Sequence, residues 1–312
     1  MTTSLPSEGA EAVRPEIYLH SYTLRGYSLA RALRKAHELG FDGIELWAGH
    51  YKLDQVEEVL RQAQPLARTL EVTVPVLNLS GEVIGDDPAQ RAERVRRVGE
   101  VIRRCPEVGV RIVNGYAGFI ILDRADWGKN GSAAAGDEHY ERAAAAYRDL
   151  GAIAQASGVT LTLEVHMNTI HDTASSALRL LDMIGSPAVR VNLDPGNMYG
   201  TSTAEPALDA ITLLAGRIAY MHLKNARRAA DQPGGVDYHW DLVHGDLDVY
   251  SIVRAAYRSG FRGPYCIEYS GAGDRAAIAR DDVSYLRGAL AEAATDTQPD
   301  DGATNPLHQE PL

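Results

Sequence analysis

Residues 161–169, LTLEVHMNT, alternate apolar and polar side chains around a glutamate and a histidine. In an extended strand, Thr162, Glu164 and His166 point to one side, while the apolar residues between them point to the other. A carboxylate is costly to bury unless it is paired or bound to a metal ion. The stretch therefore predicts a β-strand, over residues 160–167, whose polar face presents Glu164 to a charged partner or a cation.

Seven further β-rich runs lie along the chain, at residues 16–24, 43–49, 70–79, 110–118, 189–197, 218–226 and 264–270. Helical stretches with apolar residues at helical spacing separate them, for example at residues 28–40, 53–69, 88–104, 138–157 and 275–294. Regular alternation of strand and helix indicates a parallel sheet with helices outside it. Eight such units predict a single α/β domain over residues 16–293, a closed (β/α)8 TIM barrel.

The main alternative to a barrel is a doubly wound open sheet, but no glycine-rich phosphate-binding fingerprint follows the first strand. The segments that leave the fourth and seventh strands are long, whereas the turns that enter strands are short. In a TIM barrel these long segments lie on the face where active sites are built. The polar ends, residues 1–15 and 294–312, are expected to be disordered tails.

The composition of the 312 residues, 45% hydrophobic with a formal net charge of −11, is typical of a globular protein but not of a nucleic-acid-binding one. Cys105 and Cys266 are too few for a disulfide framework, which favours a reducing compartment. No apolar run approaches the length needed to span a membrane, and the first residues lack the apolar core of a signal peptide. A cytoplasmic protein without nucleic-acid or membrane partners is expected.

The same alternation places Asp194, His222 and Glu268 on the inward faces of the sixth, seventh and eighth strands, near the functional end of the barrel. Together with Glu164 they would converge on one point. Three carboxylates that converge unpaired repel one another, and a divalent cation removes this repulsion. Three oxygen donors and one imidazole favour one Mn²⁺ ion, with Mg²⁺, Co²⁺ and Zn²⁺ as alternatives.

The stretches LTLEVHMNTIHDT, VNLDPGNMYG, MHLKN and GDLDVYSIVRAAYRSGFRGPYCIEY resemble the sugar phosphate isomerase/epimerase superfamily. This superfamily has xylose-isomerase-like barrels and includes ketose 3-epimerases, inosose dehydratases and apurinic endonucleases. The resemblance implies the same four metal ligands and a sugar or keto-sugar substrate. Two features differ: Asn197 stands where ketose epimerases usually carry histidine, and Asn78 and Asn114 replace histidines that the endonucleases need, which disfavours DNA repair.

These residues predict a metal-dependent isomerase or epimerase in which Glu164 and Glu268 transfer protons beside a metal-chelated carbonyl. A second reading is a lyase or dehydratase acting on a keto-sugar or inosose, with His166 as the base. This second hypothesis includes an enzyme like the superfamily's C-glycoside-cleaving subunits, which would need a small accessory subunit. A homo-oligomer is the other assembly that the sequence allows. A third reading is a sugar-binding protein without catalysis.

Further side chains are expected to contact the substrate because they lie inward at strand ends or on the loop after the seventh strand. Trp47, for instance, could form a stacking wall for a sugar ring. The expected substrate contacts are His20, Glu45, Trp47, Tyr116, Asn197, Lys224, Arg227, Arg228 and His239.

Overall fold

The computed structural model describes residues 14–296, in which eight parallel strands close into a barrel. The order around the barrel is β1-β10-β7-β6-β5-β4-β3-β2. The strands are β1 Ile17–His20, β2 Gly43–Leu46, β3 Thr73–Asn78, β4 Ile112–Gly115, β5 Thr160–Glu164, β6 Val189–Leu193, β7 Ile218–Leu223 and β10 Tyr265–Ile267. Each lies within one of the eight predicted runs, so the predicted single-domain (β/α)8 barrel is confirmed.

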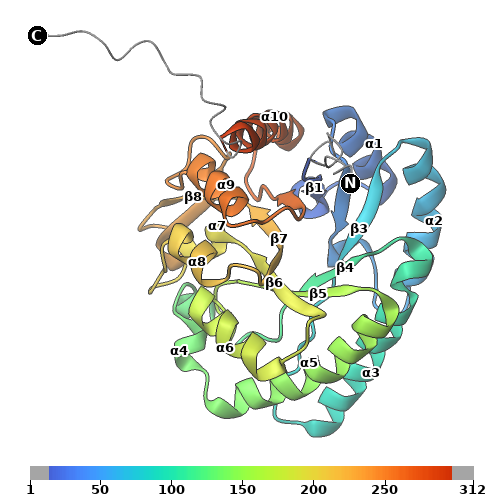
Figure 1. Ribbon diagram of the computed structural model, residues 1–312, viewed down its shortest axis with the longest axis vertical. Coiled ribbons are helices and arrows are strands. Elements are labelled where there is room, and N and C mark those ends of the chain that lie inside the picture. The colour runs from blue at the N-terminus through green and yellow to red at the C-terminus, as the bar shows by residue number, and fades with distance from the viewer. Residues whose placement is uncertain (1–13, 297–312) are drawn as a thin grey trace, which may run out of the picture.

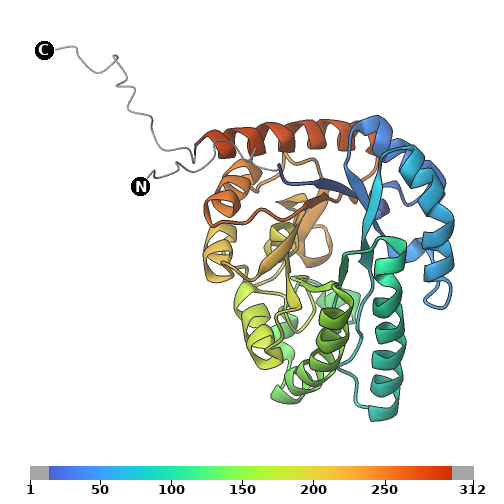
Figure 2. The same ribbon diagram turned by 45° about the vertical axis from the view of Figure 1, so that its right-hand side comes forward.

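Helices surround the strands on the outside of the barrel (Figures 1 and 2). The α-helices are α1 Leu29–Leu39, α2 Val56–Thr69, α3 Pro88–Arg104, α4 Gly131–Ala134, α5 Asp137–Ser157, α6 Ala174–Ile184, α7 Pro195–Tyr199, α8 Ala207–Leu213, α9 Val249–Arg258 and α10 Arg275–Thr295. Short 3₁₀ helices are η1 Ser21–Leu24, η2 Ala48–His50, η3 Cys105–Val108, η4 Arg124–Asp126 and η5 Pro233–Gly235. The expected tails lie outside the described residues, apart from residues 14–15 and 294–296.

Local sequence explains where several helices begin and end. Ser28, Asp87 and Thr173 precede α1, α3 and α6, and each side chain accepts a hydrogen bond from the first turn of its helix. Gly158 and Gly185 end α5 and α6 in the left-handed conformation, with φ of 68° and 67°, which glycine adopts at little cost.

Side chains alternate between the two faces of the barrel wall. The larger apolar cluster lies between strands and helices and includes Leu161, Leu163 and Val191. A smaller cluster of Tyr18, Val76, Tyr220 and Cys266 fills the barrel interior. The period-2 pattern of the strands therefore produces both the packed outer core and the inward-facing residues.

The long segment after β7 contains an antiparallel hairpin, β8 Asn225–Arg228 and β9 Val236–Trp240, that the sequence did not predict. The seventh predicted strand therefore ends early, at Leu223. Asn225 stabilises the point where the chain leaves the barrel wall, because its side-chain amide donates hydrogen bonds to the carbonyls of Leu242 and Leu247. Among the described residues, no helix is both long and apolar enough to cross a membrane.

Candidate functional site

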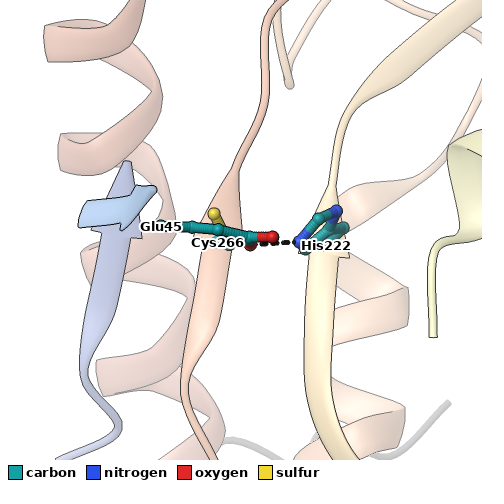
Figure 3. Close-up of side chains that lie close together, drawn as sticks. All are labelled: Glu45, His222 and Cys266. Atoms are coloured by element: carbon teal, nitrogen blue, oxygen red, sulfur yellow. Dashed lines mark hydrogen bonds and ion pairs between the residues drawn. The ribbon is translucent and has the colours of Figure 1, made fainter. Parts of the chain in front are cut away.

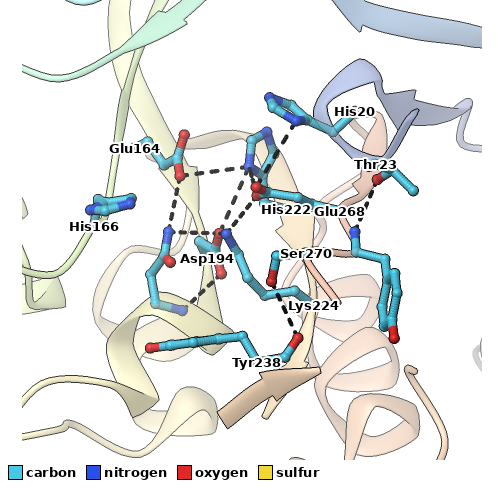
Figure 4. Close-up of polar contacts among 12 residues, drawn as sticks. His20, Thr23, Glu164, His166, Asp194, His222, Lys224, Tyr238, Glu268 and Ser270 are labelled. Atoms are coloured by element: carbon cyan, nitrogen blue, oxygen red, sulfur yellow. Dashed lines mark hydrogen bonds and ion pairs between the residues drawn. The ribbon is translucent and has the colours of Figure 1, made fainter. Parts of the chain in front are cut away.

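Four side chains meet at the end of the barrel, two from β5 and β7 and two from positions directly after β6 and β10 (Figure 4). Each of Glu164, Asp194, His222 and Glu268 offers one ligand atom, and these atoms all lie within 4.8 Å of one another. Nδ1 of His222 lies 3.7 Å from a carboxylate oxygen of each of the three acids. The structure thus brings together the four residues that were predicted to bind a metal ion.

The chemistry of this cluster fits a divalent cation. Glu164, Asp194 and His222 are 1% or less exposed, and Nδ1 of His222 is buried without a hydrogen-bond partner. Buried polar atoms are normally hydrogen-bonded or bound to a metal, so an unpaired nitrogen facing three carboxylates marks a place for a cation. Three oxygen atoms and one imidazole suit Mn²⁺, Mg²⁺, Co²⁺ or Zn²⁺.

Lys224 and Asn197 contact the same carboxylates. Nζ of Lys224 lies 3.0 Å from Oδ2 of Asp194 and 2.5 Å from Oε2 of Glu268. Nδ2 of Asn197 donates to Oε1 of Glu164 at 2.9 Å and to Oδ2 of Asp194 at 2.8 Å. Burial alone would raise the pKa of Glu268, but the charge of Lys224 holds this pKa well below its ordinary value. Burial raises the pKa of Glu164 to about 7.

Glu45, on β2, contacts the ring nitrogen of His222 that does not face the three acids (Figure 3). Nε2 of His222 lies 2.6 Å from Oε2 of Glu45, which also accepts a hydrogen bond from Tyr220 Oη at 2.8 Å. Asn114 and Asn78 donate to Oε1 at 3.0 and 3.3 Å. Burial alone would raise the pKa of Glu45, but the charges of His222 and His20 lower it to about 2. The carboxylate is thus ionised and oriented, and directs Nδ1 toward the other three acids.

Cys266 forms a second group with Glu45 and His222, in which one ligand atom of each lies within 4.8 Å of the others. Glu45 already accepts hydrogen bonds from four side chains, and the Cys266 thiol has a pKa raised well above its ordinary value by burial. A thiol must lose its proton to bind a metal ion, so this group fits a packed polar layer better than a second metal site.

Asn114 connects the two layers, a role that the sequence did not predict. Its Nδ2 donates to both Glu45 and Oε2 of Glu164, each at 3.0 Å. Its Oδ1 accepts from Thr162 and Asn192, which fixes the orientation of the amide. The alternation of β4 does place Asn114 inward, but the pattern of a single strand does not reveal partners on three others.

His166 lies on the Glu164 side of the site (Figure 4). Its Nδ1 lies 2.8 Å from the carbonyl oxygen of Met167, so Nδ1 carries the proton and Nε2 keeps a lone pair. The rings of Tyr116 and Phe119 pack against it edge to face, with centroids 4.8 and 5.5 Å away. Burial lowers the pKa of His166 to about 4, so the ring is neutral near pH 7.

His20 points into the site from the end of β1, and both of its buried ring nitrogens lack a hydrogen-bond partner. Its Nδ1 lies 4.0 Å from Oε1 of Glu268, and its Nε2 lies 3.6 Å from Oε1 of Glu45. Trp47, directly after β2, packs edge to face on Tyr22 with centroids 5.1 Å apart.

The three remaining expected contacts lie on the hairpin after β7. Arg227 and Arg228 place their guanidinium groups over the rings of Trp240 and Tyr199, 3.7 and 4.2 Å from the ring centroids. The side chain of His239 is 58% exposed and pairs with Asp237 at 3.1 Å. The structure therefore does not bring these three side chains into the metal cluster.

Comparisons with known proteins bear on the fold and the family of this chain. The sequence profile of the xylose isomerase-like TIM barrels matches residues 33–289. Fructoselysine 3-epimerase of Escherichia coli O157:H7 is 22% identical over 254 residues, 76% of this chain and 84% of that protein. 3-Dehydroshikimate dehydratase of Bacillus anthracis is 27% identical over 198 residues, 62% of this chain and 65% of that protein.

One solved structure, a xylose isomerase-like TIM barrel protein from Mycobacterium smegmatis in complex with magnesium, superposes with a TM-score of 0.72. It is 20% identical, and the match covers 91% of this chain and 99% of that chain. At this identity the superposition supports the fold, while the sequence profile, which spans most of the chain, supports membership of the family. The chain belongs to the xylose isomerase-like TIM barrel family, which confirms the resemblance seen in its sequence.

Proposed function

We propose that the chain is a divalent-metal-dependent isomerase or epimerase of carbohydrate metabolism that acts on a sugar or keto-sugar. The observation that carries this proposal is the buried, unpaired Nδ1 of His222, 3.7 Å from each of three carboxylates. Mn²⁺ is the preferred ion, and Mg²⁺ gains support from the magnesium complex of the relative from Mycobacterium smegmatis. When bound, the ion would polarise a substrate carbonyl and stabilise negative charge on its oxygen.

Glu164 and Glu268 are the proposed proton-transferring groups. They come from β5 and from the end of β10, so they approach a bound sugar from different sides of the cluster. One carboxylate would remove the proton next to the carbonyl, and the other would return a proton to the same or a neighbouring carbon. Asn114 and Asn197 hold Glu164 through hydrogen bonds at 3.0 and 2.9 Å, which fixes the direction of its oxygen atoms.

The substrate would contact the side chains that surround the cluster. His20 has free ring nitrogens for a hydroxyl group, and Lys224 presents an ammonium group. Asn197 donates its amide protons in the place where ketose epimerases usually carry histidine. We further propose outer contacts from Trp47, Tyr116, His239, Arg227 and Arg228. For Glu45, buried and bonded to four side chains, we propose orientation of His222 instead of substrate contact.

A lyase or dehydratase is the second candidate. It is favoured by the tautomer of His166, whose Nε2 lone pair is available while Nδ1 donates to Met167. A dehydratase is also among the relatives. In this reading His166 removes the proton, and a substituent on the adjacent carbon leaves with its electron pair.

Exchange of substrate hydrogen with D₂O tests the proposal. Metal-loaded protein is incubated in D₂O with ketoses, inososes and keto-glycosides, and deuterium at carbon is followed by NMR spectroscopy. We expect exchange next to a carbonyl in at least one class, together with an isomer or an elimination product. Binding of a keto-sugar without any exchange would instead favour a sugar-binding protein. A cytoplasmic location, a homo-oligomer and a small accessory subunit stay predictions.

A further inference from the structure

A cleft of ≈ 420 Å³ lies at the rim of the barrel, on the face that carries the metal cluster. We call it the rim cleft. Its apolar lining comes from the segments that follow β1, β4 and β7: Tyr22, Leu122, Trp127, Val236 and Tyr238. Ser270, two residues after Glu268, also lines it. The segments after four of the eight barrel strands thus build one space, and three of its apolar side chains are aromatic.

The rim cleft adjoins the proposed site. Tyr22 follows His20 by two residues, and their ring centroids are 6.3 Å apart. Ser270 donates a hydrogen bond to the carbonyl oxygen of Tyr238 at 3.2 Å, so the walls join next to Glu268 (Figure 4). A group that leaves the metal cluster toward solvent on this side therefore enters the cleft.

The long segments after β4 and β7 hold the cleft in shape. Gly128 and Gly234 have φ of 88° and 71°, and a Cβ atom on Gly128 would lie 2.7 Å from Cα of Gly234. Only glycine permits this approach of the two backbones. The backbone carbonyl of Asn168 accepts a hydrogen bond from the N–H of Ile120, and its side chain accepts one from the N–H of Gly128. These bonds tie the segment after β4 to the segment after β5.

The two halves of the site differ in chemistry. The metal cluster is charged, whereas the rim cleft presents three aromatic rings and the side chain of Leu122, beside the polar residues Arg124, Gln232, Asp237 and His239. Leu122 is 81% exposed, the highest value among the large hydrophobic residues that the structure describes as exposed. A free monosaccharide carries hydroxyl groups on nearly every carbon, so it would leave the exposed side chain of Leu122 uncovered.

We propose that the substrate is a sugar that bears an aromatic substituent, with the sugar at the metal cluster and the aromatic ring in the rim cleft. This inference rests on the proposed function, because it assigns the sugar to the cluster. The ring would lie among Tyr22, Trp127 and Tyr238 and cover the exposed side chain of Leu122. The class of substrate is thereby narrowed from sugars to aryl-substituted sugars.

Binding of a matched pair of probes tests the proposal. Phenyl and methyl β-D-glucopyranoside, which differ only in the substituent, are titrated into the metal-loaded full chain by isothermal calorimetry. The phenyl glycoside should bind about 10–100-fold more tightly, as expected for burial of one aromatic ring. Equal affinities, or no binding of either glycoside at millimolar concentration, would overturn the proposal.

Two variants test whether the preference for the phenyl glycoside arises in the rim cleft. Leu122→Ser should reduce the preference for the phenyl glycoside several-fold, and its exposed position makes loss of the fold unexpected. Leu208→Ser is the control, because Leu208 is 47% exposed on α8 and does not line the cleft. Equal effects of the two variants would contradict the assignment. If the metal-loaded wild-type chain exchanges no hydrogen with D₂O in any keto-sugar, the proposed function is overturned. If it shows exchange but binds the phenyl and methyl glycosides equally, only this inference is overturned.

Discussion

His222 uses its two ring nitrogens for different contacts. Nε2 lies 2.6 Å from Glu45, and Nδ1 faces Glu164, Asp194 and Glu268. Burial alone would lower the pKa of His222, but the surrounding carboxylates, Glu45 first, raise it to about 10. Without a metal ion the ring is therefore protonated, and a metal ion has to replace the proton on Nδ1.

Glu45→Gln should weaken metal binding by about 10–100-fold, because the neutral amide no longer fixes the protonated Nε2 or supports the basicity of Nδ1. Competition with a chromophoric chelator measures the dissociation constant directly. Glu16→Gln, which removes a glutamate near the opposite end of β1, is the charge-matched control. An unchanged affinity in Glu45→Gln would show that Glu45 does not position His222.

His166→Ala separates the two candidate chemistries. If Glu164 and Glu268 transfer the protons, the variant should lose only about 10–100-fold in kcat, as expected for a supporting residue. If His166 is the base of an elimination, the loss should reach about 10²–10⁴-fold while the metal content stays constant. His37→Ala, at an exposed position on α1, controls for the loss of a histidine. Wild-type turnover in His166→Ala would exclude the His166-base lyase.

The four ligands could be predicted from the sequence because each lies at the inward-facing end of a strand or directly after it and has apolar neighbours on either side. Period-2 alternation is a local property, and four strands shared it. The hydrogen bonds of Glu45 and Asn114 join residues that are far apart in sequence, such as Glu45 and Tyr220, 175 positions apart. No local pattern encodes such partners, and Glu45 was therefore predicted to bind substrate.

At the level of elements, strands were predicted at the correct places but were too long. Residues 189–197 were read as one strand, whereas β6 ends at Leu193 and Asp194 caps α7 by accepting a hydrogen bond from the backbone of Asn197. Asp followed by Pro at the first helical position is a helix-start signal. In the hairpin, β8 is polar and has no apolar alternation, whereas Val236, Tyr238 and Trp240 do alternate with polar residues in β9. Arg227 on Trp240 and Arg228 on Tyr199 help to hold the hairpin.

The loop after β9 is anchored to α10 by a buried aspartate. Asp282 accepts a hydrogen bond from the backbone N–H of Leu242 at 2.9 Å, and burial raises its pKa to about 7. Because this value is above that of an unfolded aspartate, the folded chain retains a proton that the unfolded chain releases. The stability contributed by this proton is present at low pH and is lost as the pH rises through about 7.

Asp282→Asn should therefore stabilise the chain relative to wild type by about 1–2 kcal/mol at pH 8, with a smaller difference at pH 5. Urea unfolding at the two pH values gives the free energies of unfolding. The neighbouring exposed Asp281 provides the control variant Asp281→Asn, which should show no such pH dependence. A difference that shrinks between pH 5 and pH 8 would show that Asp282 does not retain a proton in the folded chain.

For the whole molecule, the apolar core does not depend on the metal cluster. The large cluster between strands and helices includes residues from all eight barrel strands: Leu19, Ile44, Val74, Leu77, Val113, Leu163, Val191, Met221 and Ile267. Its burial favours folding whether or not a cation is bound.

Removal of the metal ion by a chelator should therefore abolish activity, lower Tm by only a few degrees and leave the far-ultraviolet circular dichroism unchanged. Adding back Mn²⁺ or Mg²⁺ should restore both Tm and activity. Cooperative unfolding on chelation would instead identify the ion as structural, and the catalytic proposal would lose its basis.

Lys224 gives the cluster a tethered cation of its own. The ammonium group lies within 3.0 Å of Asp194 and at 2.5 Å from Glu268, and it cannot diffuse away. An entering ion must compete with a positive charge whose effective concentration is fixed by the fold. We therefore expect a weakly binding monovalent ion to leave Lys224 in place, and a divalent ion to gain enough from three carboxylates to displace the lysine.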